Sequence, residues 1–169
     1  MNFMTEAQTY EGEMREFFED LHRHPEPSHF EKRTNVRIRE QLAAHGIDML
    51  CPADNITLAV IRGAMPGRPI GRRFDTAALQ MLERCDVPYK SEQDGLMHGC
   101  GHDAHTTCGV FVARLLQAHR DELCGTFKII FQPAEEGEHG ADEVIATGLV
   151  SDVDAFFGLH VWSLYPTGT

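Results

Sequence analysis

The sequence predicts an α/β fold with a mostly parallel sheet. Apolar runs of strand length alternate with amphipathic helical patterns, and this alternation is typical of a sheet covered by helices. Several reactive polar residues follow directly after apolar runs, where sheets of this kind place their functional sites. A chain of 169 residues with 42% hydrophobic residues is long enough for one core, so we expect a single domain.

Two helices are expected before the first strand. Residues 6–22 carry apolar side chains at helical spacing, and the prolines that follow His24 end this pattern. Ser28 and Glu31 match a capping box, which predicts that a second helix begins there and ends before Gly46.

The rest of the chain alternates between strands and helices. A loop is expected at residues 86–99. Strands are expected at residues 56–61, 69–74, 126–131 and 154–161, and helices at residues 104–119 and 141–147.

The composition excludes several classes of partner. A net charge of -11 and a pI near 5.3 argue against binding to nucleic acid or to anionic membranes. The polar, acidic N-terminus does not match a secretory signal, and no apolar run is long enough for a membrane span. The 5 cysteines are odd in number and lack CxxC spacing, which predicts reduced thiols in a cytoplasmic protein.

Two segments carry side chains suited to a hydrolytic metal site. Cys100 and His102 are two residues apart, so in an extended segment their side chains leave the backbone on the same side. A thiolate and an imidazole favour zinc, cobalt, nickel or manganese over magnesium or calcium. In the adjacent pair Glu135 and Glu136, one carboxylate can bind metal while its neighbour transfers protons.

The order of motifs resembles a known family. LHxHPE, MHxCGHDxH, FQPAEEG and GLH followed by PTGT resemble the metal-dependent aminoacylase-type amidohydrolases and metallopeptidases, especially the hippurate hydrolase and auxin-conjugate hydrolase branch. The resemblance runs from about residue 21 to residue 169. It implies a zinc-exopeptidase-like α/β/α sandwich, two divalent ions (Zn, Mn, Co or Ni) and hydrolysis of the amide bond in a small N-acyl amino acid or similar conjugate.

The resemblance also implies roles for individual residues. Glu135 is the expected general base, and four residues are the expected metal ligands: Cys100, His102, Glu136 and His160. Four further residues are expected beside these ligands or in contact with substrate: Asp75, His98, Asp103 and His105. For Asp103 the expected role is a hydrogen bond to a ligating imidazole. For His98 and His105 a purely structural role is an equal alternative.

The sequence departs from the family in two places. The family strand reads like LRADMDALP, and here Asp75 matches its first acidic position while Ala77 replaces the second aspartate. Full-length relatives are about twice as long, so residues 1–169 are expected to be the N-terminal portion of a catalytic domain. A lid domain that mediates homodimerisation in relatives, and a further histidine ligand, are then absent. Two alternatives to a hydrolase therefore stay open: a non-catalytic metal-binding remnant, and an interaction protein that needs a partner chain.

Overall fold

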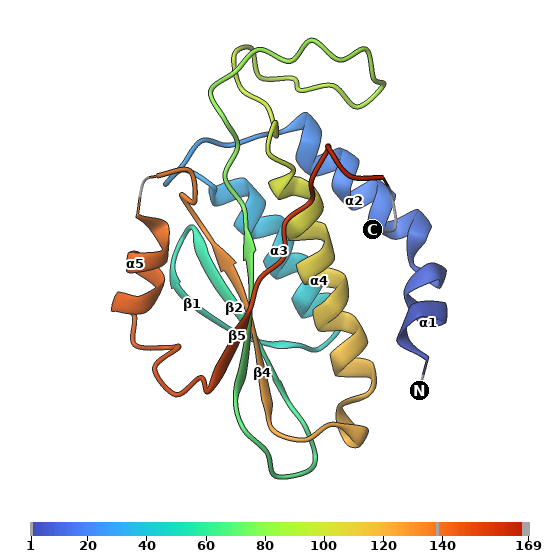
Figure 1. Ribbon diagram of the computed structural model, residues 1–169, viewed down its shortest axis with the longest axis vertical. Coiled ribbons are helices and arrows are strands. Elements are labelled where there is room, and N and C mark those ends of the chain that lie inside the picture. Colours follow the sequence, from blue (N-terminus) through green and yellow to red (C-terminus); the bar gives the residue numbers. More distant parts are fainter. Residues whose placement is uncertain (1, 138, 167–169) are drawn as a thin grey trace.

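The computed structural model describes residues 2–137 and 139–166 (Figure 1). Its helices are α1 (Phe3–Thr9), α2 (Glu11–Arg23), α3 (Lys32–Ala44), α4 (His102–Ala118), the short 3-10 helix η1 (Arg120–Glu122) and α5 (Gly140–Ala146). Its strands are β1 (Asp48–Ala53), β2 (Ile56–Arg62), β3 (Ile70–Asp75), β4 (Thr126–Gln132) and β5 (Ala155–Phe157). Thr167, Gly168 and Thr169 of the last motif, and Glu138, which directly follows the FQPAEEG motif, lie outside the described residues.

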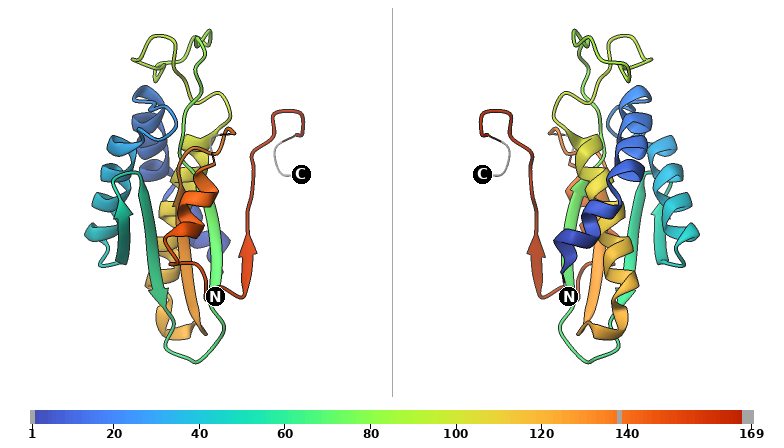
Figure 2. Two further views of the ribbon diagram at one scale, coloured as in Figure 1. Left: turned by 90° about the vertical axis from the view of Figure 1, so that its left-hand side faces the viewer. Right: turned by 90° about the vertical axis from the view of Figure 1, so that its right-hand side faces the viewer.

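The five strands form one mixed sheet in the order β1-β2-β4-β3-β5. Strand β3 is parallel to β4 and to β5, whereas β2 is antiparallel to both of its neighbours, β1 and β4. Four strands therefore run in one direction and only β2 is reversed, which confirms the predicted mostly parallel sheet. Figure 2 shows β5 as the outer strand at one edge of the molecule.

Helices cover both faces of the sheet, as the predicted α/β/α arrangement requires. Alternate residues of the central strands point to opposite faces. Ile129 and Phe131 of β4 join the larger core with α2, α3 and α4, while Ile130 joins a smaller core that includes Val144 of α5. β2 is buried along nearly its whole length, and its buried residues are accordingly apolar apart from Thr57.

Two expectations differ from the structure in the N-terminal half, and one strand lies where none was expected. The helix predicted at residues 6–22 is interrupted at Tyr10, which ends α1 and begins α2. The predicted capping box is wrong, because the Glu31 carboxylate accepts the Ala134 N–H at 2.8 Å and makes no capping bond. Glu26 instead accepts the N–H groups of the first turn of α3 at 2.9 and 2.7 Å. Strand β1 was not predicted, because it is an exposed edge strand without a clear apolar pattern.

The last strand is shorter than predicted. β5 contains 3 residues, so His160 lies in the segment that follows the strand. The side chains of β5 and of the following segment are largely exposed, including Phe156, Phe157 and Trp162.

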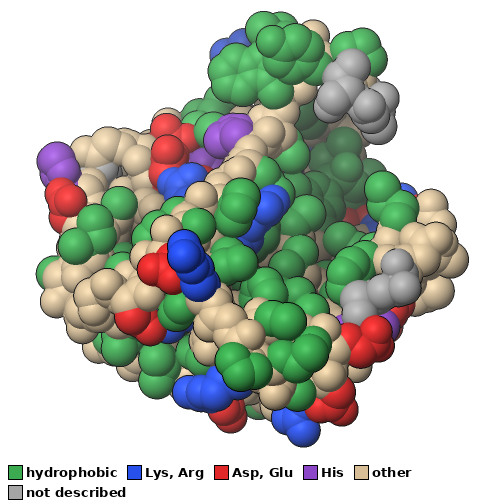
Figure 3. Space-filling model, turned by 60° about the horizontal axis from the view of Figure 1, so that its bottom comes forward, with side chains coloured by type: hydrophobic (Ala, Val, Ile, Leu, Met, Phe, Trp, Pro, Cys, Tyr) green, Lys and Arg blue, Asp and Glu red, His purple; other side chains and the backbone are tan. Residues whose placement is uncertain are grey.

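On the face shown in Figure 3, hydrophobic side chains gather in a hollow. A cavity of about 450 Å³ lies between α1, α2 and α4, and Met4, Met14 and Phe18 are among its lining residues.

Candidate metal centre

The candidate site lies where β3 and β4 end and where α4 begins. The chain leaves β4 at Gln132 and reaches Glu135 three residues later, while His102 is the first residue of α4. Gly101 precedes the helix with a φ of 85°, a conformation that L side chains rarely adopt. A Cβ atom at Gly101 would also lie 2.5 Å from Val161 Cγ2. The tight turn therefore requires glycine and brings the segment after β5 against the start of α4.

His102 lies at the centre of the cluster. Its ring is fully buried, and its Nδ1–H donates a hydrogen bond to the Ala77 carbonyl at 2.7 Å. Nε2 therefore carries a lone pair, and it has no hydrogen-bond partner. Three carboxylate oxygens face Nε2: Glu135 Oε2 at 3.6 Å, Glu136 Oε1 at 3.7 Å and Asp75 Oδ1 at 3.8 Å. A buried, unpartnered nitrogen among carboxylates is a suitable ligand for a divalent cation.

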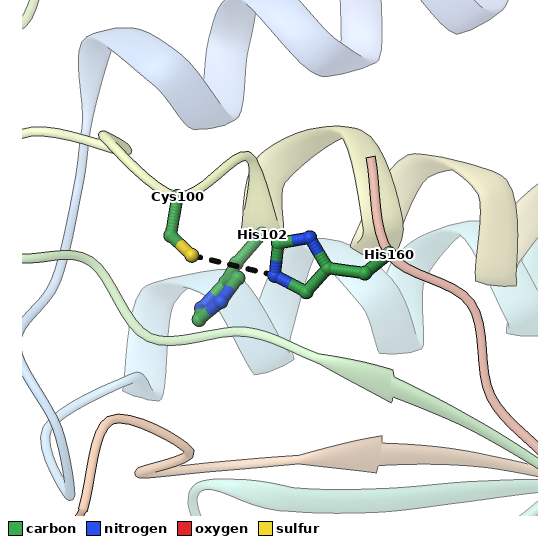
Figure 4. Close-up of side chains that lie close together, drawn as sticks. All are labelled: Cys100, His102 and His160. Atoms are coloured by element: carbon green, nitrogen blue, oxygen red, sulfur yellow. Dashed lines mark hydrogen bonds between the residues drawn. The ribbon is translucent and has the colours of Figure 1, made fainter. Parts of the chain in front are cut away.

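Cys100 and His160 lie beside His102 (Figure 4). Cys100 Sγ is 3.3 Å from His160 Nε2, and His160 Nδ1–H donates to the Val161 carbonyl at 2.6 Å. Burial raises the pKa of the Cys100 thiol to about 12, aided by a hydrogen bond to Glu136 and by the surrounding negative charges. A thiolate among these carboxylates thus requires a positive charge nearby.

The donor atoms form three groups, and His102 belongs to all of them. The groups are Cys100–His102–His160, His102–Glu135–Glu136 and Asp75–His102–His105, each with donor atoms within 4.8 Å of one another. Ligand atoms around one tetrahedral zinc ion lie about 3.3–3.8 Å apart, given Zn–N and Zn–S bonds of about 2.0–2.3 Å. Four of the separations in the cluster, Cys100–His160 and those from His102 to its three carboxylates, are 3.3–3.8 Å and match that spacing. The donor set therefore fits divalent metal.

Asp75 and His105 link β3 to the segment after β5. His105 Nδ1–H donates to Asp75 Oδ1 at 2.5 Å, and His105 Nε2 accepts the Val161 N–H at 3.0 Å. Both ring nitrogens of His105 are thus engaged within the protein. Burial alone would raise the pKa of Asp75, but the His105 hydrogen bond and the nearby His102 and Arg73 hold it below its ordinary value.

Arg73 is part of the site and was missed in the sequence. Its Nη1 lies 2.8 Å from Asp75 Oδ2, its Nη2 lies 3.7 Å from Glu135 Oε1, and its Nε–H donates to Gln132 Oε1 at 2.9 Å. The guanidinium therefore offsets part of the negative charge of the carboxylate cluster. Arg73 and Asp75 are two residues apart on β3, and this spacing was the signal that could have identified the arginine.

His98 and Asp103 do not join the cluster around His102. The expected hydrogen bond from Asp103 to a ligating imidazole is not formed, because the Asp103 carboxylate lies 2.6 Å from His22 Nδ1 instead. His98 is buried near His22, with ring centroids 6.4 Å apart, and neither of its ring nitrogens has a partner. Burial lowers the pKa of His98 to about 4, so this imidazole is neutral near pH 7.

The three-layer fold and the donor cluster together are typical of the catalytic domain of a metallopeptidase-type hydrolase. The chain belongs to peptidase family M20/M25/M40, whose family model matches residues 73–169. This match covers more than half of the chain and includes every residue of the cluster.

Individual relatives agree with this assignment. N-acetylcysteine deacetylase of Bacillus subtilis (strain 168) is 42% identical over 152 residues, which cover 89% of this chain and 40% of the relative. IAA-amino acid hydrolase ILR1-like 4 of Arabidopsis thaliana is 38% identical over 141 residues, covering 83% of this chain and 32% of the relative. The crystal structure of a dinuclear metal-binding M20 peptidase of Bacillus subtilis superposes with a TM-score of 0.92 at 38% identity, covering 95% of this chain and 46% of that chain.

The chain thus spans about 40% of the length of the first curated relatives it matches. Among the described residues, every helix is too short or too polar to cross a membrane.

Proposed function

We propose that the protein hydrolyses the amide bond of small N-acyl amino acids, including hippurate-like conjugates, with two divalent metal ions. The observation that carries this proposal is the buried Nε2 of His102, which faces Glu135 and Glu136 at 3.6 and 3.7 Å and has no partner. The names of two relatives, an N-acetylcysteine deacetylase and an IAA-amino acid hydrolase, support an acyl group joined to an amino acid as the substrate class.

Each residue of the cluster has a proposed role. Four residues would hold the metal ions: Cys100, His102, Glu136 and His160. When bound, the ions supply Lewis acidity that polarises the amide carbonyl and acidifies the attacking water. Glu135 takes the proton from this water and returns it to the leaving amine, so that one water is consumed and one carboxylate and one amine are formed. Glu135 suits this role because one of its oxygens faces the cluster while the other faces Arg73.

The cavity beside the cluster favours a small, partly apolar substrate. A cavity of about 580 Å³ is lined by Cys100 and His160 and by the apolar side chains of Phe18, Trp162 and Leu164. This volume lies in the range of small-molecule sites. An acyl group fits against the apolar wall, with its amide directed toward the metal ligands.

Metal binding without turnover is a second candidate for the chain by itself. Ala77, which replaces the second aspartate of the family strand, favours it, since removing a carboxylate beside metal ligands typically costs about 10–100-fold in metal affinity or activity. A third possibility is an interaction role in which the exposed edge at β5 pairs with another chain.

Hydrolysis assays on the metal-loaded chain test these alternatives. The substrates are N-acetylcysteine and N-benzoylglycine, with Zn²⁺, Mn²⁺ or Co²⁺, and the matched control is Glu135→Gln. We expect turnover that chelation abolishes, and a Glu135→Gln variant that keeps its metal content but loses turnover. If Glu135→Gln hydrolyses the substrate as fast as the wild-type chain, Glu135 is not the general base. A fully loaded wild-type chain without turnover favours metal binding alone.

A further inference from the structure

A buried cluster of charged residues lies outside the proposed ligand set. His22, at the end of α2, is sandwiched between two carboxylates: its Nδ1 is 2.6 Å from Asp103 Oδ2 and its Nε2 is 3.2 Å from Glu83 Oε1. All three residues are buried, with exposed fractions of 8%, 1% and 4% for His22, Asp103 and Glu83. Since both ring nitrogens face carboxylate acceptors, both donate hydrogen bonds and the imidazole is positively charged. These hydrogen bonds, first of all the one to Asp103, raise the pKa of His22.

One side of this cluster fixes the first turn of α4. Asp103 directly follows the proposed ligand His102. Its Oδ2 is taken by His22, while its Oδ1 accepts the Ala104 N–H at 2.8 Å. The Asp103 carbonyl accepts the Thr107 hydroxyl at 2.8 Å. The side chain of Asp103 is therefore held at both oxygens, and the backbone that carries His102 is tied to the end of α2.

The other side fixes the loop between β3 and α4. Glu83 Oε2 accepts the Ser91 N–H at 2.7 Å, and the Glu92 N–H donates to the Arg23 carbonyl at 2.9 Å. At the base of this loop, Leu79 and Met97 exchange backbone hydrogen bonds of 2.9 and 3.0 Å. The loop thus begins next to Ala77, whose carbonyl orients the His102 ring, and it ends next to Cys100.

We infer that His22 is a positioning residue of the metal centre, which orients Cys100 and His102 through Asp103 on one side and Glu83 on the other. This inference rests on the proposed metal site and adds a residue that touches none of the ligands. Removing His22 leaves two buried carboxylates without a countercharge, and such groups move toward water or toward other donors. Either movement shifts the segment that carries the two ligands.

Zn²⁺ affinity of the purified chain, measured by competition with a chromophoric chelator, tests the inference. We expect His22→Gln to weaken Zn²⁺ binding by about 10-fold, the lower end of the range for groups that hydrogen-bond a metal ligand, because His22 acts on the ligands through Asp103 and Glu83. His24→Gln is the matched control. His24 belongs to the same motif but is partly exposed; it bonds the Asp20 carbonyl, and its Nε2 lies 3.6 Å from the exposed Glu92 carboxylate. Because neither contact reaches Asp103 or Glu83, the Zn²⁺ affinity of His24→Gln should stay within about 2-fold of wild type. Affinities of His22→Gln and wild type within 2-fold of each other overturn the inference.

A second control distinguishes the positioning role of His22 from a general loss of stability. Leu42→Ala removes a fully buried side chain of α3 and should lower the unfolding temperature without changing Zn²⁺ affinity. If Leu42→Ala weakens binding as much as His22→Gln, positioning is excluded. Should His22→Gln fail to fold, Asp103→Asn weakens the same contact at nearly constant volume, and its unchanged affinity likewise contradicts the inference.

A measurement on the metal-free chain tests the positioning role of His22 separately from the proposed function. In the metal-free, ¹⁵N-labelled chain, the imidazole nitrogens of His102 report the hydrogen bond from Nδ1 to Ala77. We expect the His102 nitrogen shifts to change in His22→Gln and to stay constant in His24→Gln. Unchanged His102 shifts in both variants overturn the positioning role. A wild-type chain that binds no Zn²⁺ counts against the proposed function alone, because the ¹⁵N comparison still tests His22.

Discussion

Gly109→Ala tests how closely α4 packs on the sheet that positions the metal centre. Gly109 is buried on α4, and a Cβ atom there would lie 2.7 Å from Phe131 Cε1 and 2.8 Å from Phe74 Cδ2. Both phenylalanines are fully buried on neighbouring strands, with their rings stacked at a centroid distance of 6.4 Å. Because both rings are fully buried and the distances are below van der Waals contact, we expect the added methyl group to push α4 away from β3 and β4.

The expected magnitude is the difference between two opposing effects. Alanine is more favourable than glycine inside a helix by about 0.5–1 kcal/mol. Overpacking a tight core costs about 1–3 kcal/mol. We therefore expect Gly109→Ala to lower the free energy of unfolding by about 1 kcal/mol, and the unfolding temperature by about 2–4 °C in a chain of this size.

Urea unfolding followed by circular dichroism measures this change, and Gly12→Ala is the matched control. Gly12 lies near the start of α2, and a Cβ atom there would have no neighbour within 4 Å. Only the helix preference acts at Gly12, so this variant should gain up to about 1 kcal/mol. If Gly109→Ala is stabilised as much as Gly12→Ala, α4 accommodates the methyl group without moving away from β3 and β4, contrary to the expected overpacking.

Three further perturbations have defined outcomes. Phe131→Ala should lower the free energy of unfolding by about 3–5 kcal/mol in the same urea assay, because its fully buried ring leaves a cavity between β4 and α4. Ala77→Asp restores the carboxylate of the family strand beside His102, and Zn²⁺ competition should show tighter binding by about 10-fold or more. Burial raises the pKa of Asp20, but hydrogen bonds from Arg33 and Arg37 outweigh it and hold the pKa below its ordinary value. The stability that Asp20 contributes is therefore present at neutral pH and lost as the pH falls below about 4, so thermal melts from pH 7 to pH 3 should show a shallower decline for Asp20→Asn.

The parts of the fold with strong periodic patterns were predictable from the sequence. β4 is buried on both faces, and α4 carries an apolar face over several turns, so both elements appear in the sequence as clear patterns. β1 was missed because its side chains are exposed. The Ser28–Glu31 pattern predicted a cap that does not form, because Glu31 has a tertiary partner in Ala134 that local reasoning does not include.

The kinds of metal-binding side chain at the site were predictable from the sequence, but the contacts of the surrounding residues were not. Cys100, His102, Glu135 and Glu136 stand in two short motifs, and this density of metal-binding side chains indicated the site. The links from Asp103 to His22 and from Arg73 to Glu135 join residues that are far apart in the sequence, and only the folded chain brings them together.

Both proposals depend on the claim that the cluster around His102 binds divalent metal. Elemental mass spectrometry on the size-exclusion peak of the purified chain, dialysed against Zn²⁺, measures this binding, with His102→Ala as the comparison. Since His102 belongs to all three donor groups, we expect about two ions per wild-type chain and near-complete loss in His102→Ala. Equal metal content in both proteins, or no metal in the wild-type chain, contradicts the claim.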